Sequence, residues 1–96
     1  SENWLKKLPR EEIAYFLNRA RQLGQAEDFK GVTRTCNELL SRYPDTVEAL
    51  FLQGAAFFKL GMNGRARESW DRVLQLSPNH DKARRWLAKL PPEDQV

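Results

Sequence analysis

Residues 47–78 read VEALFLQGAAFFKLGMNGRARESWDRVLQLSP, and this stretch predicts two antiparallel helices joined by a turn. Gly54 lacks a Cβ, so a second helix can approach the first closely there, which offsets a helix propensity about 1 kcal/mol poorer than that of alanine. In the second half, Ala66 is the small residue expected at the crossing, and Trp70 supplies a large apolar side chain one turn later. Gly61 marks the end of the first helix, because glycine readily adopts the left-handed conformation that often follows a helix.

The order of residue types in this stretch resembles a tetratricopeptide repeat, in which an aromatic residue or Leu, a Leu-Gly pair, and then Tyr, Ala, Phe and Pro recur at fixed offsets. The resemblance is carried by Leu50, Gln53, Gly54, Phe57, Ala66, Trp70, Val73 and Pro78. Two of these depart from the pattern, since Leu50 replaces the usual Trp and Gln53 the usual Leu. The resemblance implies an all-α fold in which antiparallel helix-turn-helix units form a short right-handed α-solenoid.

The same period relates this stretch to the residues before it. Pro44 and Pro78 are separated by 34 residues (78 minus 44), which is the period of the family that the stretch resembles. Shifting by this period pairs apolar or small residues with one another: Phe16 with Leu50, Ala20 with Gly54, Leu23 with Phe57, Val32 with Ala66, Cys36 with Trp70 and Leu39 with Val73. Arg19 and Val32 stand where the family prefers Leu and Ala, so the first unit is expected to be a degenerate repeat.

These signals divide the chain into five parts. They are a lead-in at residues 1–9, a degenerate repeat at 10–44, a second repeat at 45–78, a C-terminal capping helix at 79–90 and a tail at 91–96. Pro9 is expected to begin the first helix, Gly24 to end or loosen it, and Asp28 to cap the second helix. Asp45 and Asn79, each directly after a proline, are expected near the starts of the helices that follow.

Composition narrows the class of protein. The 96 residues suit one small domain, and the net charge of +3 permits an acidic partner without demanding one, so a nucleic-acid partner is disfavoured. No apolar run approaches the roughly 18 to 20 residues that span a membrane, and the single Cys36 cannot form an internal disulfide. A reducing, cytoplasmic location is the default expectation. The chain begins at Ser1 instead of Met, so we expect an excised piece or a processed product whose parent carries any targeting signal.

No residues have the spacing of a catalytic or metal site. His80 is the only histidine and follows a proline at a helix start, where local capping or a surface contact is expected, and a metal site needs three or four ligands. Cys36 occupies the position paired with Trp70, so a small buried residue is favoured over a nucleophile. We therefore predict no enzymatic activity and no cofactor.

The resemblance implies a concave groove, lined by the first helices of successive units, that holds an extended or helical peptide of a partner protein. Helical periodicity then predicts its lining. These residues are Leu17, Arg21 and Gly24, then Glu48, Phe51, Leu52, Ala55, Phe58 and Lys59, and finally Lys82, Arg85 and Lys89. Aromatic and Arg residues tend to dominate interface energetics, so the expected ligand is apolar with acidic residues or a free carboxyl group. In the competing interpretation, Phe51 and Phe58 belong to the core and the cations only keep the cap soluble.

One subtype of the family grips the terminal carboxylate of chaperone peptides with a set of Lys, Asn and Arg residues. Here Leu17 and Arg21 stand where the first Lys and Asn belong, Leu52 replaces the second Asn, and Trp86 replaces the Arg. Only Lys82 agrees, so a chaperone-adaptor role is disfavoured.

The sequence thus predicts a non-catalytic protein–protein interaction module. Two alternatives stay open. The chain could regulate an enzyme elsewhere in a longer polypeptide, such as a bacterial signalling or secretion component. It could also self-assemble, because a short array leaves its end faces partly covered and the segment with Trp4 and Leu5 could dock on a neighbouring copy.

Overall fold

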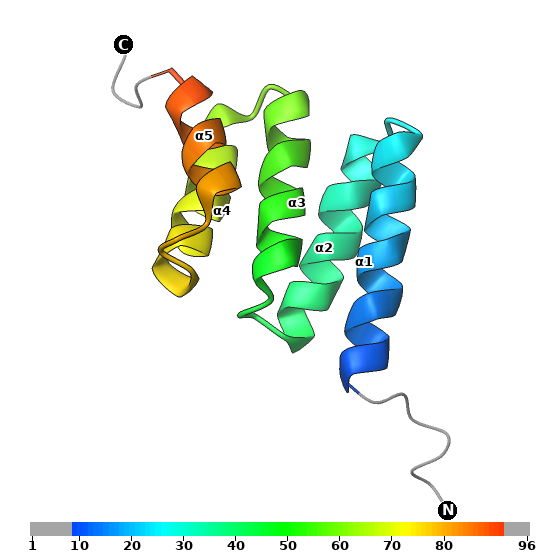
Figure 1. Ribbon diagram of the computed structural model, residues 1–96. Helices are drawn as coiled ribbons and strands as arrows, with labels where there is room; N and C mark the ends of the chain where they lie inside the picture. Colours follow the sequence, from blue (N-terminus) through cyan, green and yellow to red (C-terminus); the bar gives the residue numbers. More distant parts are fainter. Residues whose placement is uncertain (1–8, 92–96) are drawn as a thin grey trace, which may run out of the picture.

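Five helices follow one another in the computed structural model, which describes residues 9–91 (Figure 1). They are α1 (Pro9–Gln25), α2 (Phe29–Arg42), α3 (Val47–Lys59), α4 (Asn63–Leu76) and α5 (Asp81–Lys89). No strand occurs within residues 9–91, so the predicted all-α fold is confirmed. The expected tail beyond residue 91 and the segment with Trp4 and Leu5 lie outside the described residues.

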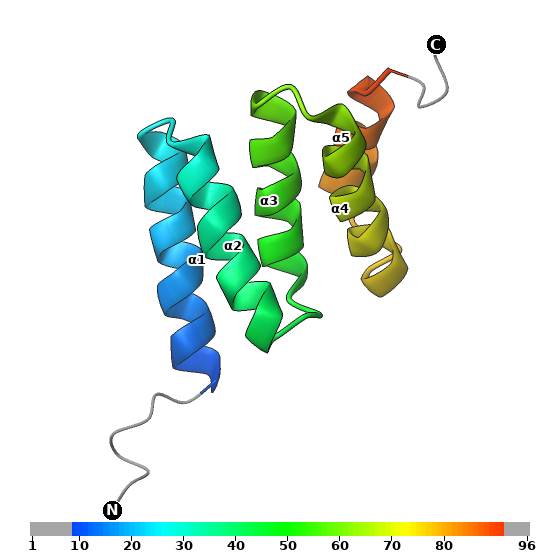
Figure 2. The ribbon, with the colours of Figure 1, turned by 180° about the vertical axis from the view of Figure 1, so that it is seen from behind.

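The helices pack mainly against their neighbours in the chain. α1 with α2 and α3 with α4 form antiparallel helix-turn-helix pairs, α2 packs against α3, and α5 packs against α4. Figure 2 shows α1, α2 and α3 running side by side, with α4 and α5 beyond them. α1 also contacts α3, so the first helices of the two pairs lie next to each other. This arrangement is that of stacked repeats, in which each unit covers an apolar face of the next.

A close contact between Gly54 of α3 and Trp70 of α4 joins the second helix pair. A Cβ built at Gly54 would lie 2.7 and 2.8 Å from two carbons of the Trp70 ring and still closer to its Nε1. Trp70 is 0% exposed, and its indole N–H donates a hydrogen bond to the backbone carbonyl of Phe51 at 3.2 Å. The close approach that the sequence predicts at Gly54 is therefore confirmed.

The first helix pair has the same crossing with different side chains. Ala20 and Cys36 stand at the positions paired with Gly54 and Trp70, and both are buried in one cluster with Val32. The first pair thus has a methyl group and a thiol at the positions where the second pair has a glycine backbone against an indole. The 34-residue pairing extends through the core: Ala20 and Gly54, Val32 and Ala66, Cys36 and Trp70, and Leu39 and Val73 are all buried.

The turn after α3 is a Schellman motif. The N–H of Met62 donates to the carbonyl of Phe57 at 2.8 Å, and the N–H of Gly61 donates to the carbonyl of Phe58 at 3.0 Å. Gly61 has a φ of 80°, the left-handed conformation that this motif requires. The helix end predicted at Gly61 is confirmed.

The turn after α1 repeats this motif 34 residues earlier with a non-glycine residue. The N–H of Asp28 donates to the carbonyl of Leu23 at 2.9 Å, the N–H of Glu27 donates to that of Gly24 at 3.0 Å, and Glu27 has a φ of 62°. Gly24 was expected to end or loosen α1; the helix ends one residue later, at Gln25, and Glu27 instead of Gly24 takes the left-handed position. A Cβ in that conformation costs roughly 1–2 kcal/mol.

The helix starts lie where the sequence predicts them. Asp28 caps α2 as predicted, accepting a hydrogen bond from the N–H of Gly31 at 3.1 Å, and α1 begins at Pro9. Asp45 and Asn79 lie near the starts of α3 and α5 as expected, each one residue before the capping position, which Thr46 and His80 occupy.

The side chains at these two starts have local roles. His80 Nδ1 accepts a hydrogen bond from the N–H of Ala83 at 3.1 Å, so the predicted capping role of His80 is confirmed. Asp45 instead pairs with Arg72 of α4 at 3.1 Å.

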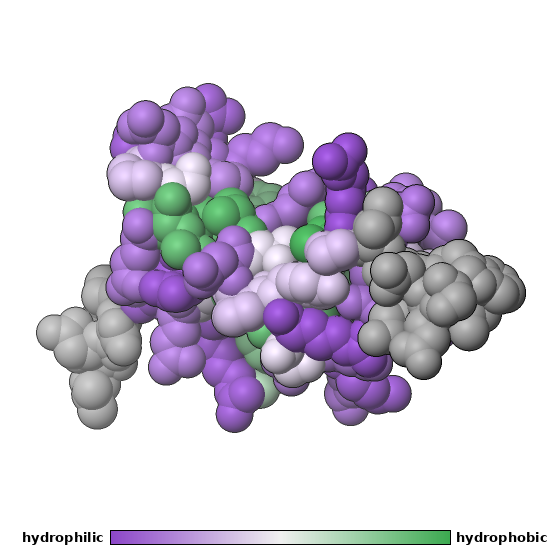
Figure 3. Space-filling model, turned by 90° about the horizontal axis from the view of Figure 1, so that it is seen from below, coloured by the Kyte–Doolittle hydropathy of each residue, from purple (hydrophilic) through white to green (hydrophobic). Residues whose placement is uncertain are grey.

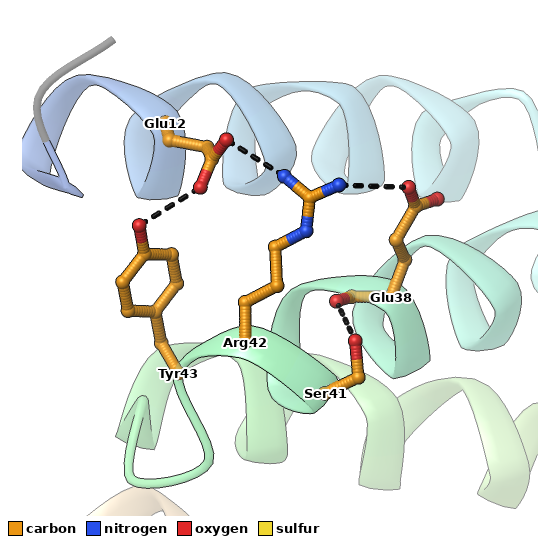
Figure 4. A network of polar contacts seen from close by, with 5 residues as sticks. All are labelled: Glu12, Glu38, Ser41, Arg42 and Tyr43. Carbon is orange, nitrogen blue, oxygen red and sulfur yellow. Dashed lines mark hydrogen bonds and ion pairs between the residues drawn. The ribbon is translucent and has the colours of Figure 1, made fainter. Parts of the chain in front are cut away.

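A polar network ties the start of α1 to the end of α2 (Figure 4). The carboxylate of Glu12 accepts a hydrogen bond from Arg42 at 2.7 Å and another from the hydroxyl of Tyr43 at 2.8 Å. Arg42 also lies 3.9 Å from a carboxylate oxygen of Glu38. The hydrogen bond to Glu12 is the main reason that the pKa of Tyr43 is raised.

The Gly54–Trp70 contact can be tested with a double-mutant cycle. We expect Trp70→Ala to lower the free energy of unfolding by about 3–5 kcal/mol, and Gly54→Ala alone to lower it by about 1–3 kcal/mol through overpacking. In the Trp70→Ala background the indole is gone, so Gly54→Ala should become neutral or stabilising by up to about 1 kcal/mol. Urea unfolding of the four proteins measures the coupling. Additive effects would show that the two residues do not meet.

The left-handed residue after α1 generates a second prediction. Glu27→Gly should raise the free energy of unfolding by about 0.5–1 kcal/mol, since it relieves the Cβ strain and loses part of the gain to the more flexible unfolded chain. Gly61→Ala is the matched opposite change and should be destabilising by a similar amount. Both are measured by urea unfolding, and a destabilising Glu27→Gly would contradict the assigned backbone conformation.

Candidate partner-binding surface

Two hollows on the surface involve α1, α3 and α5. The α1–α3 hollow has a volume of about 400 Å³ and the α5 hollow about 780 Å³. Trp86 of α5 lines both of them. Viewed from below, polar and charged side chains cover most of the molecule and apolar side chains show in small patches between them (Figure 3).

Small and apolar side chains create the α1–α3 hollow. Ala20 of α1 and Ala55 and Ala56 of α3 leave space between the two helices, and the backbone of Gly24 borders it. The remaining lining residues are Arg21, Gln25, Phe29, Val32, Leu52, Lys59 and Trp86. The hollow is therefore a largely apolar depression with polar groups among its lining.

The charge of Arg21 is balanced within the protein. Its guanidinium forms an ion pair with Glu48 of α3, and it donates a weak hydrogen bond to Asn18 at 3.4 Å. The side chains of Arg21 and Glu48 are 44% and 55% exposed, so this pair lies at the surface, where it contributes little to stability.

The α5 hollow is basic. Lys82, Arg85 and Lys89 are exposed and lie at positions i, i+3 and i+7, which places them along one face of α5. The ammonium group of Lys89 lies 4.6 Å from the centre of the Trp86 ring, a cation–π distance. Within residues 9–91, no carboxylate is paired with Lys82 or Arg85. Phe51 and Ala88 complete the lining.

An aromatic cluster holds α5 in place. The ring of Trp86 lies 5.5 Å from that of Phe58 in an edge-on arrangement and 5.7 Å from that of Trp70. Phe51 packs near Trp70, with ring centres 6.3 Å apart, and near His80 at 5.2 Å. Trp86 is thus fixed from behind while it faces both hollows.

The predicted groove residues fall into three groups. Arg21, Gly24, Leu52, Ala55 and Lys59 line the α1–α3 hollow, Phe51, Lys82, Arg85 and Lys89 line the α5 hollow, and Leu17, Glu48 and Phe58 line neither. Phe51 and Phe58 both pack against the core, as the competing interpretation expects, and Phe51 also borders a hollow. Leu17 is only 7% exposed and packs with Leu39 and Ala49, because it lies on the buried stripe of α1.

Several lining residues were not among the predicted groove residues: Ala20, Gln25, Phe29, Val32, Ala56, Trp86 and Ala88. The sequence places Trp86 on the apolar face of the capping helix and at a departure from the chaperone-binding set, and its position four residues after Lys82 was a usable signal for the hollow. Phe29 and Val32 come from α2, which the resemblance to the family does not assign to the groove.

The described residues hold no group of three or more His, Cys, Asp or Glu side chains placed to bind a metal ion. Cys36 is 0% exposed, and its burial raises the pKa of the thiol to about 12, which makes it a core residue of low reactivity. None of the helices within residues 9–91 is both long enough and apolar enough to cross a membrane.

Comparison with family models matches residues 47–80 to the tetratricopeptide repeat. The match covers α3, the turn at Gly61, α4 and the turn that leads to His80. A search of curated proteins found no match. The chain therefore carries a tetratricopeptide repeat, a module that in general mediates protein–protein interactions.

Proposed function

We propose that this chain is a non-catalytic protein-binding module whose α1, α3 and α5 surface takes up an acidic peptide segment of a partner protein. The observation that carries the proposal is the charge of the α5 hollow. Its lining includes Lys82, Arg85 and Lys89 and, among the described residues, no Asp or Glu.

Charge of one sign favours a partner of the other sign in two ways. It speeds the encounter with an acidic segment, and it penalises a basic one, because like charges brought together cost free energy. The net charge of the whole chain is only +3, so this preference comes from where the cations gather and not from their total number.

The aromatic side chains supply the apolar part of the contact. Phe51 and Trp86 are half-buried and already held by neighbouring rings, so little side-chain freedom is lost when a ligand covers them. Aromatic and Arg residues carry a large share of the binding energy in many interfaces. The surface offers both kinds within one hollow.

Arg85→Glu tests this proposal. We would select peptides from a random library displayed on phage, using residues 1–96 as the target, and measure the affinity of the selected peptides by calorimetry. The peptides should be enriched in Asp and Glu. Arg85→Glu should lower their affinity by about tenfold or more, since an attraction between opposite charges becomes a repulsion between like charges. The free energy of unfolding should change by less than about 0.5 kcal/mol.

Arg34→Glu is the matched control, because Arg34 is an exposed arginine of α2 that lines neither hollow. It should leave the affinity unchanged. Selected peptides without acidic residues, or equal effects of the two substitutions, would refute the proposal.

A further inference from the structure

The two hollows differ in character although they share Trp86. The α1–α3 hollow is apolar, and the charge of Arg21 there is already paired with Glu48. Its other cation, Lys59, lies in the last turn of α3, where the carbonyl end of the helix partly balances a positive charge. An acidic side chain of a ligand placed in this hollow would therefore gain little electrostatic attraction.

The α5 hollow offers the opposite conditions. Lys82 and Arg85 have no paired carboxylate among the described residues, and they stand on the exposed face of α5. A carboxylate of a ligand would meet two cations there without first displacing an internal partner.

We infer that the ligand is bipartite: one large apolar side chain sits in the α1–α3 hollow, and a cluster of acidic residues lies over α5, on the other side of Trp86. The inference rests on the proposed function and adds a division of labour between the two hollows. The volume of about 400 Å³ and the three alanines leave room for a leucine or an aromatic side chain. The peptide backbone then crosses the Trp86 ring, which covers it on one side with apolar surface.

Glu48 enforces this division. It lines neither hollow, yet it holds Arg21 of the α1–α3 hollow in an ion pair. With Glu48 in place, an acidic side chain at the apolar position finds no free cation on Arg21 and meets the carboxylate of Glu48 nearby. Removing the charge of Glu48 should therefore relax the preference for an apolar residue at that position.

Double-mutant cycles between protein and peptide test the inference, with an acidic peptide from the phage selection as the probe. Ala55→Gln fills the α1–α3 hollow and should weaken binding roughly tenfold, the loss expected when one large side chain is no longer buried. The same loss should follow when the apolar residue of the peptide is changed to Ser. The two changes combined should lower the affinity no more than either change alone.

A second filling variant guards against a folding defect in the first. Gly24→Gln enters the hollow from α1, and a Cβ at Gly24 would lie at an ordinary 3.8 Å from Val32. Ala14→Gln is the matched control, because Ala14 is exposed on α1 and lines neither hollow. The control should leave the affinity unchanged, and none of the variants should lower the unfolding midpoint, since a side chain at Gly24 favours the helix.

The acidic half is tested in the same way. Lys82→Gln should lower the affinity for the acidic probe peptide several-fold. It should have no effect on the affinity for a peptide whose acidic residues are changed to Gln, whereas Ala55→Gln should lower the affinity for that peptide as much as for the probe. Glu48→Gln should raise the affinity of a probe with Glu at the apolar position.

The outcomes separate the two proposals. If the selected peptides are acidic and depend on Arg85 but ignore both filling variants, the bipartite ligand is refuted and the acidic groove stands. If no acidic peptides are selected, both fail. A single-stranded oligonucleotide that binds more tightly than every selected peptide would also overturn the inference.

Discussion

The arrangement of the second half of the molecule depends on one steric constraint: the indole of Trp70 occupies the space that a Cβ of residue 54 would need. Only glycine at that position lets α3 and α4 pack this closely with a tryptophan between them. The same indole lies 5.7 Å from the Trp86 ring and 6.2 Å from that of Phe58. A contact inside the second helix pair therefore also sets the position of α5, and with it the position of Trp86, which lines both hollows.

The features that could be predicted from the sequence are local or periodic. Proline and glycine determine where a helix begins or ends within a few residues, as at Pro9 and Gly61, because they restrict or free the backbone itself. The 34-residue period identifies equivalent positions of the two units, such as Cys36 and Trp70, because equivalent positions of stacked units have equivalent neighbours. Helical spacing also placed Lys82 and Arg85 on one exposed face, where the structure has them.

The features that could not be predicted depend on how helices are rotated and on strain that other contacts offset. Leu17 and Arg21 are one turn apart, yet the first is buried against Leu39 and only the second lines a hollow, which follows from the rotation of α1 relative to α2 and α3. Glu27 adopts a left-handed conformation that its residue type disfavours, because the chain must reverse there between two packed helices.

The differences between the two helix pairs bear on the binding surface as well as on the core. In the second pair, Trp70 fills the crossing and supports Trp86. In the first pair the equivalent residues Ala20 and Cys36 lie in one buried cluster, and Ala20 also borders the α1–α3 hollow. A bulky residue at position 20 would take up the space that the hollow offers. The small side chain of Ala20 in the first unit thus leaves room beside α3, while Trp70 of the second unit supports Trp86 on the opposite side of the hollow.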